Sequence, residues 1–125
     1  MKKIISTNNA PAAIGPYSQA TVHNNVLYVS GQLPIDPATG ELVAGDITQE
    51  THRVMQNVAA IVEAAGGKME NVLKATILLT DMNNFAAVNQ VYETYFPANP
   101  PARICYQVVA LPKGVQVEVD AICAL

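Results

Sequence analysis

The spacing of apolar residues in the middle of the chain changes from a helical period to a strand period within a few residues. Over residues 54–65 they recur every three or four positions, as on one face of an α-helix, and Gly66–Gly67 supplies a stop. Asp46 and Gln49 have the spacing of a capping box at the start of that helix. Residues 72–80 alternate as in a half-buried strand. The chain is therefore expected to pack a helix against a sheet.

Turn residues and prolines delimit the other elements. Asn24–Asn25 suits the positive φ angles of a hairpin turn, and Gly31 is expected to end the following strand or to form a bulge. A second helix is predicted from residue 83 or 84 to Phe96, where prolines prevent its continuation. The remaining strand patterns cover residues 3–5, 20–23, 26–30, 103–109 and 115–123. We expect the last two of these segments to pair as an antiparallel hairpin.

This order of elements predicts an α+β fold in which both helices cover one face of a mixed or antiparallel sheet. A length of 125 residues favours a single domain over residues 1–125. Because 50% of the residues are apolar and only 14% are charged, the uncovered face of the sheet is expected to need a partner. We therefore expect a homo-oligomer.

Charge and composition argue against several classes of function. The net charge is −3 and the 7 Lys and Arg residues are scattered, which disfavours binding to nucleic acid. No apolar run approaches the roughly 20 residues that a membrane-spanning helix needs, and the N-terminal apolar stretch is too short for a signal peptide. We expect a cytoplasmic protein without membrane contacts, whose Cys105 and Cys123 are free thiols.

Familiar cofactor and catalytic motifs are absent from the sequence. It contains no glycine-rich phosphate loop, Cys-x-x-Cys pair, His-Glu-x-x-His helix or Gly-x-Ser-x-Gly turn. His23 and His52 are far apart in the sequence, and a surface position is a more frequent outcome for each than a role as metal ligand or general base.

Two charged residues are candidates for chemistry. Arg103 opens a strand shortly after two prolines, and a guanidinium placed by so rigid a segment can bind a carboxylate through two parallel hydrogen bonds. A structural ion pair is the more frequent role for such an arginine. Glu118 lies in an alternating strand whose polar side is solvated by default. If the last two predicted strands form a hairpin in which Val109 pairs near Gln116, Arg103 and Glu118 would lie close together on neighbouring strands. Arg103, Cys105 and Glu118 would then share one face of the sheet.

Asn89 and Tyr17 are further candidates, each with a structural alternative. Asn89 lies between Phe85 and Tyr92 on the second predicted helix, at the edge of an apolar stripe that includes both aromatic residues. A buried amide there needs partners or an interface. Tyr17 lies in a loop rich in proline and glycine, where its ring either covers a ligand or, more often, fixes the loop.

Several motifs occur along the chain in an order and spacing that chance does not explain. They are Asn9–Gln19, Ser30–Pro34, Asn57–Val58, Ala64–Gly66, Phe85–Asn89, Pro101–Cys105, Leu111–Lys113 and Val117–Val119. With these motifs, which extend over nearly the whole chain, the sequence resembles the Rid family of reactive-intermediate (imine) deaminases.

The resemblance implies a chorismate-mutase-like (bacillary type) α+β fold, assembled as a homotrimer with sites in the clefts between subunits. It implies hydrolysis of 2-iminobutanoate and 2-iminopropanoate to 2-oxo acids and ammonia, with no cofactor and no metal. By the same resemblance Arg103 would bind the substrate carboxylate, Glu118 would hold and polarise the attacking water, and Tyr17 would close over the imine. The other residues that it places around substrate or water are Ser30, Gly31, Asn89 and Cys105.

The sequence departs from the family pattern beside Arg103. Many members follow the arginine with serine where this chain has Ile104, and carry Glu-Val-Ala-Arg where it has Gln107–Ala110. These changes bear on substrate preference more than on reaction type, since Arg103 and Glu118 are both present. The alternative function is a regulatory trimer that binds small carboxylates without turnover. Ribonuclease activity, attributed to relatives, is disfavoured by the acidic composition.

Overall fold

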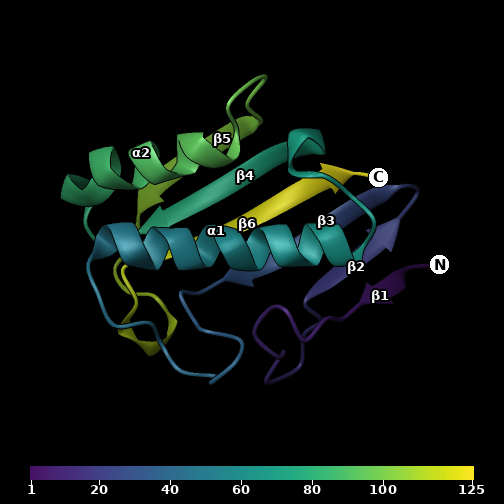
Figure 1. The fold of residues 1–125 in the computed structure, drawn as a ribbon, viewed down its shortest axis with the longest axis horizontal. Coiled ribbons are helices and arrows are strands. Elements are labelled where there is room, and N and C mark those ends of the chain that lie inside the picture. The colour runs from purple at the N-terminus through teal and green to yellow at the C-terminus, as the bar shows by residue number, and fades with distance from the viewer.

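The computed structural model describes residues 1–125 as a six-stranded sheet with two α-helices on one face (Figure 1). The strands lie in the order β1-β2-β3-β6-β4-β5. Their bounds are β1 Lys3–Ile5, β2 Ala20–His23, β3 Val26–Gln32, β4 Val72–Leu79, β5 Ala102–Gln107 and β6 Val117–Ala124. The helices are α1 Ile47–Ala64 and α2 Phe85–Tyr95, with short 3₁₀ turns at Met69–Asn71, Met82–Asn84 and Pro112–Gly114. The predicted α+β fold with both helices on one face of a mixed sheet is confirmed.

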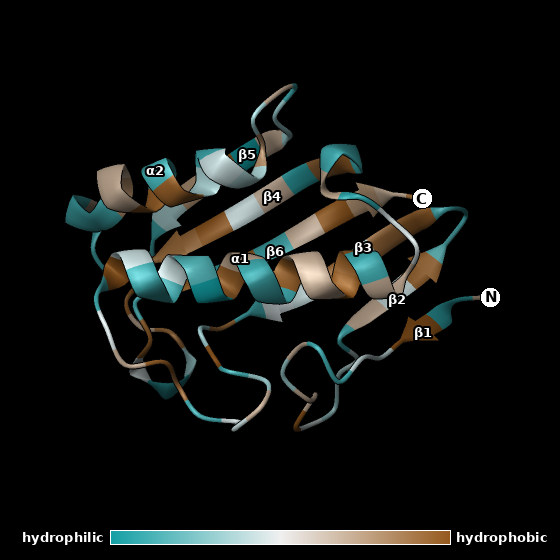
Figure 2. Cartoon of the chain, in the orientation of Figure 1, coloured by the Kyte–Doolittle hydropathy of each residue, from teal (hydrophilic) through white to brown (hydrophobic).

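The core lies between the helices and the sheet. Val54, Val58 and Ile61, on the predicted apolar face of α1, are no more than 1% exposed. They belong to one apolar cluster with side chains from the strands, among them Leu27, Ile77, Leu79, Val117 and Val119. Figure 2 shows the corresponding apolar and polar bands along β4 and β6. Neither α-helix has the length and hydropathy needed to cross a membrane.

Local signals for turns and helix ends act as predicted. The side chain of Asp46 accepts the N–H of Gln49 at 3.0 Å, and the side chain of Gln49 accepts the N–H of Asp46 at 3.1 Å, which completes the capping box of α1. Asn24 and Asn25 have φ angles of 49° and 60° in the turn between β2 and β3. The register of β3 on β6 shifts between Val29 and Gln32, so the predicted bulge at Gly31 is confirmed.

The predicted hairpin of the last two strands is wrong. β5 is parallel to β4, and β6 is antiparallel to β4 on its other side, so that β4 separates the two strands (Figure 1). The reason is that α2 forms a crossover from β4 to β5, and parallel neighbours require a connection of that length. The segment after β5 then passes the end of β4, where the N–H of Val108 donates to the carbonyl of Leu79 at 2.8 Å.

Candidate functional site

Arg103 lies on the edge strand β5, on the side of the sheet that faces α2. Its register partner is Ala75, which is buried under the helices. Arg103 Nη1 donates a hydrogen bond to Asn89 Oδ1 at 2.6 Å. Its Cζ atom lies 5.4 Å from the centre of the Phe85 ring and 5.1 Å from that of Tyr92. The guanidinium is thus exposed to solvent and yet held by three side chains.

This arrangement leaves the guanidinium able to bind an acid. A guanidinium has several N–H donors in a fixed fork, and within the chain Arg103 uses one of them, toward Asn89. The others suit a carboxylate, which accepts two parallel hydrogen bonds from such a fork.

Cys105 lies two residues further along β5 and faces the same side, in register with Ile77. Burial raises the pKa of the Cys105 thiol, and the charge of Arg103 opposes that shift only in part. A thiol with a raised pKa stays protonated near neutral pH, so this side chain is not an activated nucleophile.

Glu118 lies on the opposite face of the sheet, where its carboxylate covers Gly31. A methyl group on Gly31 would overlap Oε2 of Glu118, so any side chain at this position would displace the carboxylate. Burial first, and then the negative charge of nearby Asp120, raise the pKa of the Glu118 carboxyl. Asp120 itself accepts the N–H of Thr76 at 3.1 Å. A half-buried carboxylate with a raised pKa is suited to accept a proton near neutral pH.

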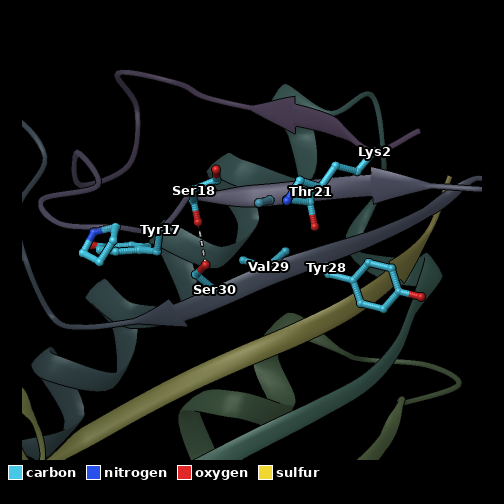
Figure 3. A pocket seen from close by; sticks show the side chains of 9 residues that line it. Lys2, Tyr17, Ser18, Thr21, Tyr28, Val29 and Ser30 are labelled. Carbon is cyan, nitrogen blue, oxygen red and sulfur yellow. Dashed lines mark hydrogen bonds between the residues drawn. The ribbon is translucent and has the colours of Figure 1, made fainter.

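Ser30 and Tyr17 line an open depression of about 530 Å³ over β2 and β3. Figure 3 shows Tyr17 at one end of it and Tyr28 at the other, with Ser30 between them. The Ser30 hydroxyl donates to the carbonyl of Ser18 at 2.6 Å, while the Tyr17 ring is 53% exposed. Because Ser30 directly precedes Gly31, the depression adjoins the strand segment that Glu118 covers.

A buried amide fixes the loop that carries Tyr17. Gln19 is 3% exposed, and its side-chain nitrogen donates to the carbonyls of Thr7, Ala10 and Pro11 at 3.0, 3.3 and 2.8 Å. Its side-chain oxygen accepts the N–H of Thr7 at 2.7 Å. Sequence reasoning included Gln19 only as part of a motif. The signal that could have identified Gln19 was its position, because it is a single amide side chain between an irregular loop and an apolar strand.

The predicted site residues form two groups on opposite faces of the sheet. Arg103 is in register with Ala75 and Glu118 with Leu78, and residues three apart on one strand point to opposite sides. The prediction that Arg103, Cys105 and Glu118 share one face is therefore wrong, because β4 lies between their strands. One group is Arg103, Asn89 and Cys105, and the other is Tyr17, Ser30, Gly31 and Glu118.

Sequence reasoning missed two residues beside Arg103. It placed Phe85 and Tyr92 in the apolar stripe of the second helix, with no further role. Their spacing around Asn89 was the available signal, because residues three and four apart on a helix are neighbours on one face.

Similarity to known proteins covers both groups of residues. The family model described as endoribonuclease L-PSP matches residues 7–125. A protein of Capra hircus named 2-iminobutanoate/2-iminopropanoate deaminase is 53% identical over 122 residues, which cover 98% of this chain and 89% of that protein. The chain belongs to the Rid (L-PSP) family. The resemblance indicated by the sequence motifs is confirmed.

Two solved structures have the fold of this Rid-family chain. YyfA of Yersinia pestis, a protein of the conserved Rid family, is 46% identical with a TM-score of 0.98 and covers 100% of both chains. TdcF of E. coli, solved with bound serine, is 43% identical with a TM-score of 0.94 and covers 98% of both chains.

Proposed function

We propose that this chain is a 2-iminobutanoate/2-iminopropanoate deaminase, which hydrolyses 2-imino acids to 2-oxo acids and ammonia. The observation that carries the proposal is the exposed guanidinium of Arg103, held in place by Asn89 and two aromatic rings. Such a group is suited to bind the carboxylate that both substrates share. The relative named for this activity, 53% identical to this chain, supports the same conclusion.

Arg103 and Glu118 can act in one site if different copies of the chain supply them. Within a chain they point to opposite faces of the sheet. The face that carries Glu118 also exposes large apolar side chains, which favours contact with another protein surface. These side chains are Ile4, Tyr28, Ile104 and Tyr106, at 52, 48, 45 and 51% exposure. We propose a chorismate-mutase-like homotrimer in which these sheet faces meet and Arg103 of one copy approaches Glu118 of another.

In this site the guanidinium binds the substrate carboxylate and fixes the plane of the imino acid. Glu118 takes a proton from water as the water oxygen adds to the carbon of the C=N bond. The proton then passes to the nitrogen, which gives a carbinolamine. Glu118 next takes the hydroxyl proton of the carbinolamine and delivers it to the nitrogen, so that the C–N bond breaks, ammonia leaves and the C=O bond of the 2-oxo acid forms. Because the imine carbon is already electrophilic, positioning and a polarised water are sufficient, and the proposal includes no cofactor or metal.

The other residues of the site contribute contacts around the reacting atoms. The backbone at Ser30 and Gly31 interrupts the regular ladder at a bulge, which leaves it suited to polar contacts with substrate or water. The exposed ring of Tyr17 closes over the imine, and Cys105 lies beside the guanidinium that binds the carboxylate.

The test couples the purified chain to a threonine dehydratase, which releases the imine, and follows the formation of 2-oxobutanoate. We expect acceleration by the wild-type chain, loss of that acceleration in Arg103→Ala, and its retention in Arg53→Ala. Arg53 is the matched control because it is the other arginine of the chain and lies on α1, where it bonds Asn57 at 3.1 Å. No acceleration by the wild-type chain would contradict the proposal.

A trimer that binds small carboxylates without turnover is the second candidate. The serine in the TdcF structure favours it, because serine carries an α-carboxylate and is not an imine. Calorimetric titration with serine and with 2-oxobutanoate separates the two functions. Binding of these acids without acceleration of the coupled reaction would favour the second candidate.

A further inference from the structure

Three side chains of α2 converge on the guanidinium of Arg103. Phe85, Asn89 and Tyr92 are spaced so that they lie on one face of the helix. Asn89 accepts the hydrogen bond at 2.6 Å, and the centres of the Tyr92 and Phe85 rings lie 5.1 and 5.4 Å from Arg103 Cζ. One rigid element therefore fixes both the place of the guanidinium and the direction that its plane faces.

The two rings differ in how firmly they are held. Tyr92 is 4% exposed and packs on Phe96, with the ring centres 4.8 Å apart. Phe85 is only partly buried at the edge of the core. A ring supported by the core on one side cannot move away when the guanidinium packs against its other side. Tyr92 is thus the fixed part of the contact.

The hydroxyl of Tyr92 does not explain why a tyrosine lies here. It is buried and has no hydrogen-bond partner in the chain, an arrangement that is unfavourable for a hydroxyl. Burial also raises the pKa of Tyr92, so the phenol is neutral and forms no ion pair with Arg103. What contacts the guanidinium is the ring, through the attraction between a cation and an aromatic face.

We propose that Tyr92 is a positioning residue whose ring holds Arg103 in the orientation that binds the substrate carboxylate. The substrate in this proposal rests on the proposed function, whereas the contact between the Tyr92 ring and Arg103 does not. An exposed arginine without such support samples many rotamers and loses that freedom on binding, which weakens affinity. The carboxylate does not change during the reaction, so Tyr92 acts on substrate binding and not on the chemical step.

The first test measures the motion of the Arg103 side chain by ¹⁵N relaxation of its Nε–Hε group in the full chain. Arg53 is the other arginine and serves as an internal control. We expect an ordered Arg103 in the wild type and in Tyr92→Phe, which keeps the ring, and a mobile one in Tyr92→Leu. The Arg53 signal is expected to stay unchanged in all three. An Arg103 as ordered in Tyr92→Leu as in the wild type would overturn the proposal.

The second test uses the deaminase reaction. Tyr92→Leu is expected to raise KM about fivefold, the size of one cation–π contact, with kcat within about twofold, while Tyr92→Phe matches the wild type. In an Arg103→Ala background, Tyr92→Leu is expected to cause no further change. An undiminished effect in that background, or an equal effect of Tyr92→Phe, would overturn the role of the ring on Arg103.

The matched control for lost packing is Val91→Ala. Val91 is 4% exposed on the same helix but is rotated by about 100° from Tyr92. We expect it to lower thermal stability and leave KM unchanged; an equal rise in KM would assign the effect to stability and overturn the proposal. Absence of turnover in the wild type would overturn the proposed deaminase activity alone, because the relaxation measurement decides the positioning role without it.

Discussion

The α2–β5 edge and the opposite face of the sheet hold their charged groups in different ways. At the edge, side chains hold Arg103, through one hydrogen bond and two rings. On the opposite face, the Glu118 carboxylate lies over Gly31 and fits there only because position 31 has no side chain. A group held by several side chains should survive the loss of one contact with weaker binding. A group that occupies the space of a missing side chain should lose much of its activity when that space is filled.

The largest effect is expected from removing Glu118, the proposed proton acceptor. Glu118→Gln keeps the shape of the side chain but cannot take a proton from water, so kcat is expected to fall about a thousandfold, with KM changed much less. Steady-state kinetics with the dehydratase-coupled imine measures both constants. Glu93→Gln, an exposed carboxylate on α2, is the control and should behave as the wild type. An unchanged kcat in Glu118→Gln would exclude Glu118 as the proton acceptor.

At the edge, the expected effect is on binding. Arg103→Ala removes the charge and the paired donors, so KM and the dissociation constant of 2-oxobutanoate are expected to rise about a hundredfold. Arg103→Lys restores the charge without the planar fork and should recover part of the affinity. Calorimetry and kinetics measure the two constants. Equal affinity in Arg103→Ala and the wild type would place the carboxylate elsewhere.

Filling the space at position 31 tests the contrast directly. Gly31→Ala is expected to push the end of the Glu118 side chain aside and to lower kcat about tenfold. The free energy of unfolding is expected to change by only about 1 kcal/mol, because the flexible Glu118 side chain can move away from the added methyl group. Thermal unfolding and kinetics of the same preparation separate the two effects. Full activity in Gly31→Ala would show that the carboxylate does not act from its position over Gly31.

The pH profile should distinguish the two regions by a smaller effect. In the proposed reaction Glu118 must be ionised to accept a proton, so kcat is expected to fall as the pH drops through its pKa, which burial and Asp120 raise. Asp120→Asn removes the like charge and keeps an oxygen for the N–H of Thr76. The acid limb of kcat is therefore expected to move to lower pH. A limb that stays in place would exclude Asp120 as a cause of the raised pKa.

The smallest effect is expected on RNA. Neither region gathers basic side chains, and the chain has a net charge of −3, so no binding or cleavage of single-stranded RNA is expected even at low salt. Gel mobility and cleavage assays measure this. Cleavage by the wild type that Arg103→Ala abolishes would assign a nuclease activity to the edge.

Elements with a local cause could be predicted from the sequence. The capping box of α1 and the turn at Asn24–Asn25 depend on residues a few positions apart. The position of β5 in the sheet has no local cause, because its alternating residue pattern is the same whichever strand it pairs with. Its pairing with β4 depends on how α2 packs on the sheet, which involves residues far apart in the chain.

In the candidate site, the types of the functional residues could be predicted from the sequence, whereas their positions in space could not. A guanidinium and a carboxylate could be predicted from the chemistry of Arg103 and Glu118 and from the family motifs. Their faces could not, because an intervening strand decides whether two side chains point the same way. The sequence predicts a core position for the ring of Tyr92, and only the folded structure shows that this ring also packs against the guanidinium of Arg103.

The most direct measurement concerns which copies supply the two charged residues. At a substrate concentration near the wild-type KM, the Arg103→Ala and Glu118→Gln chains are each expected to be nearly inactive, and the two are assembled together at equal amounts. If copies mix at random in a symmetric oligomer, about one quarter of the sites receive an intact Arg103 and an intact Glu118 from different chains. A site between copies therefore predicts recovery of about a quarter of the wild-type rate at that substrate concentration. Activity no higher than that of either variant alone would contradict a site shared between copies.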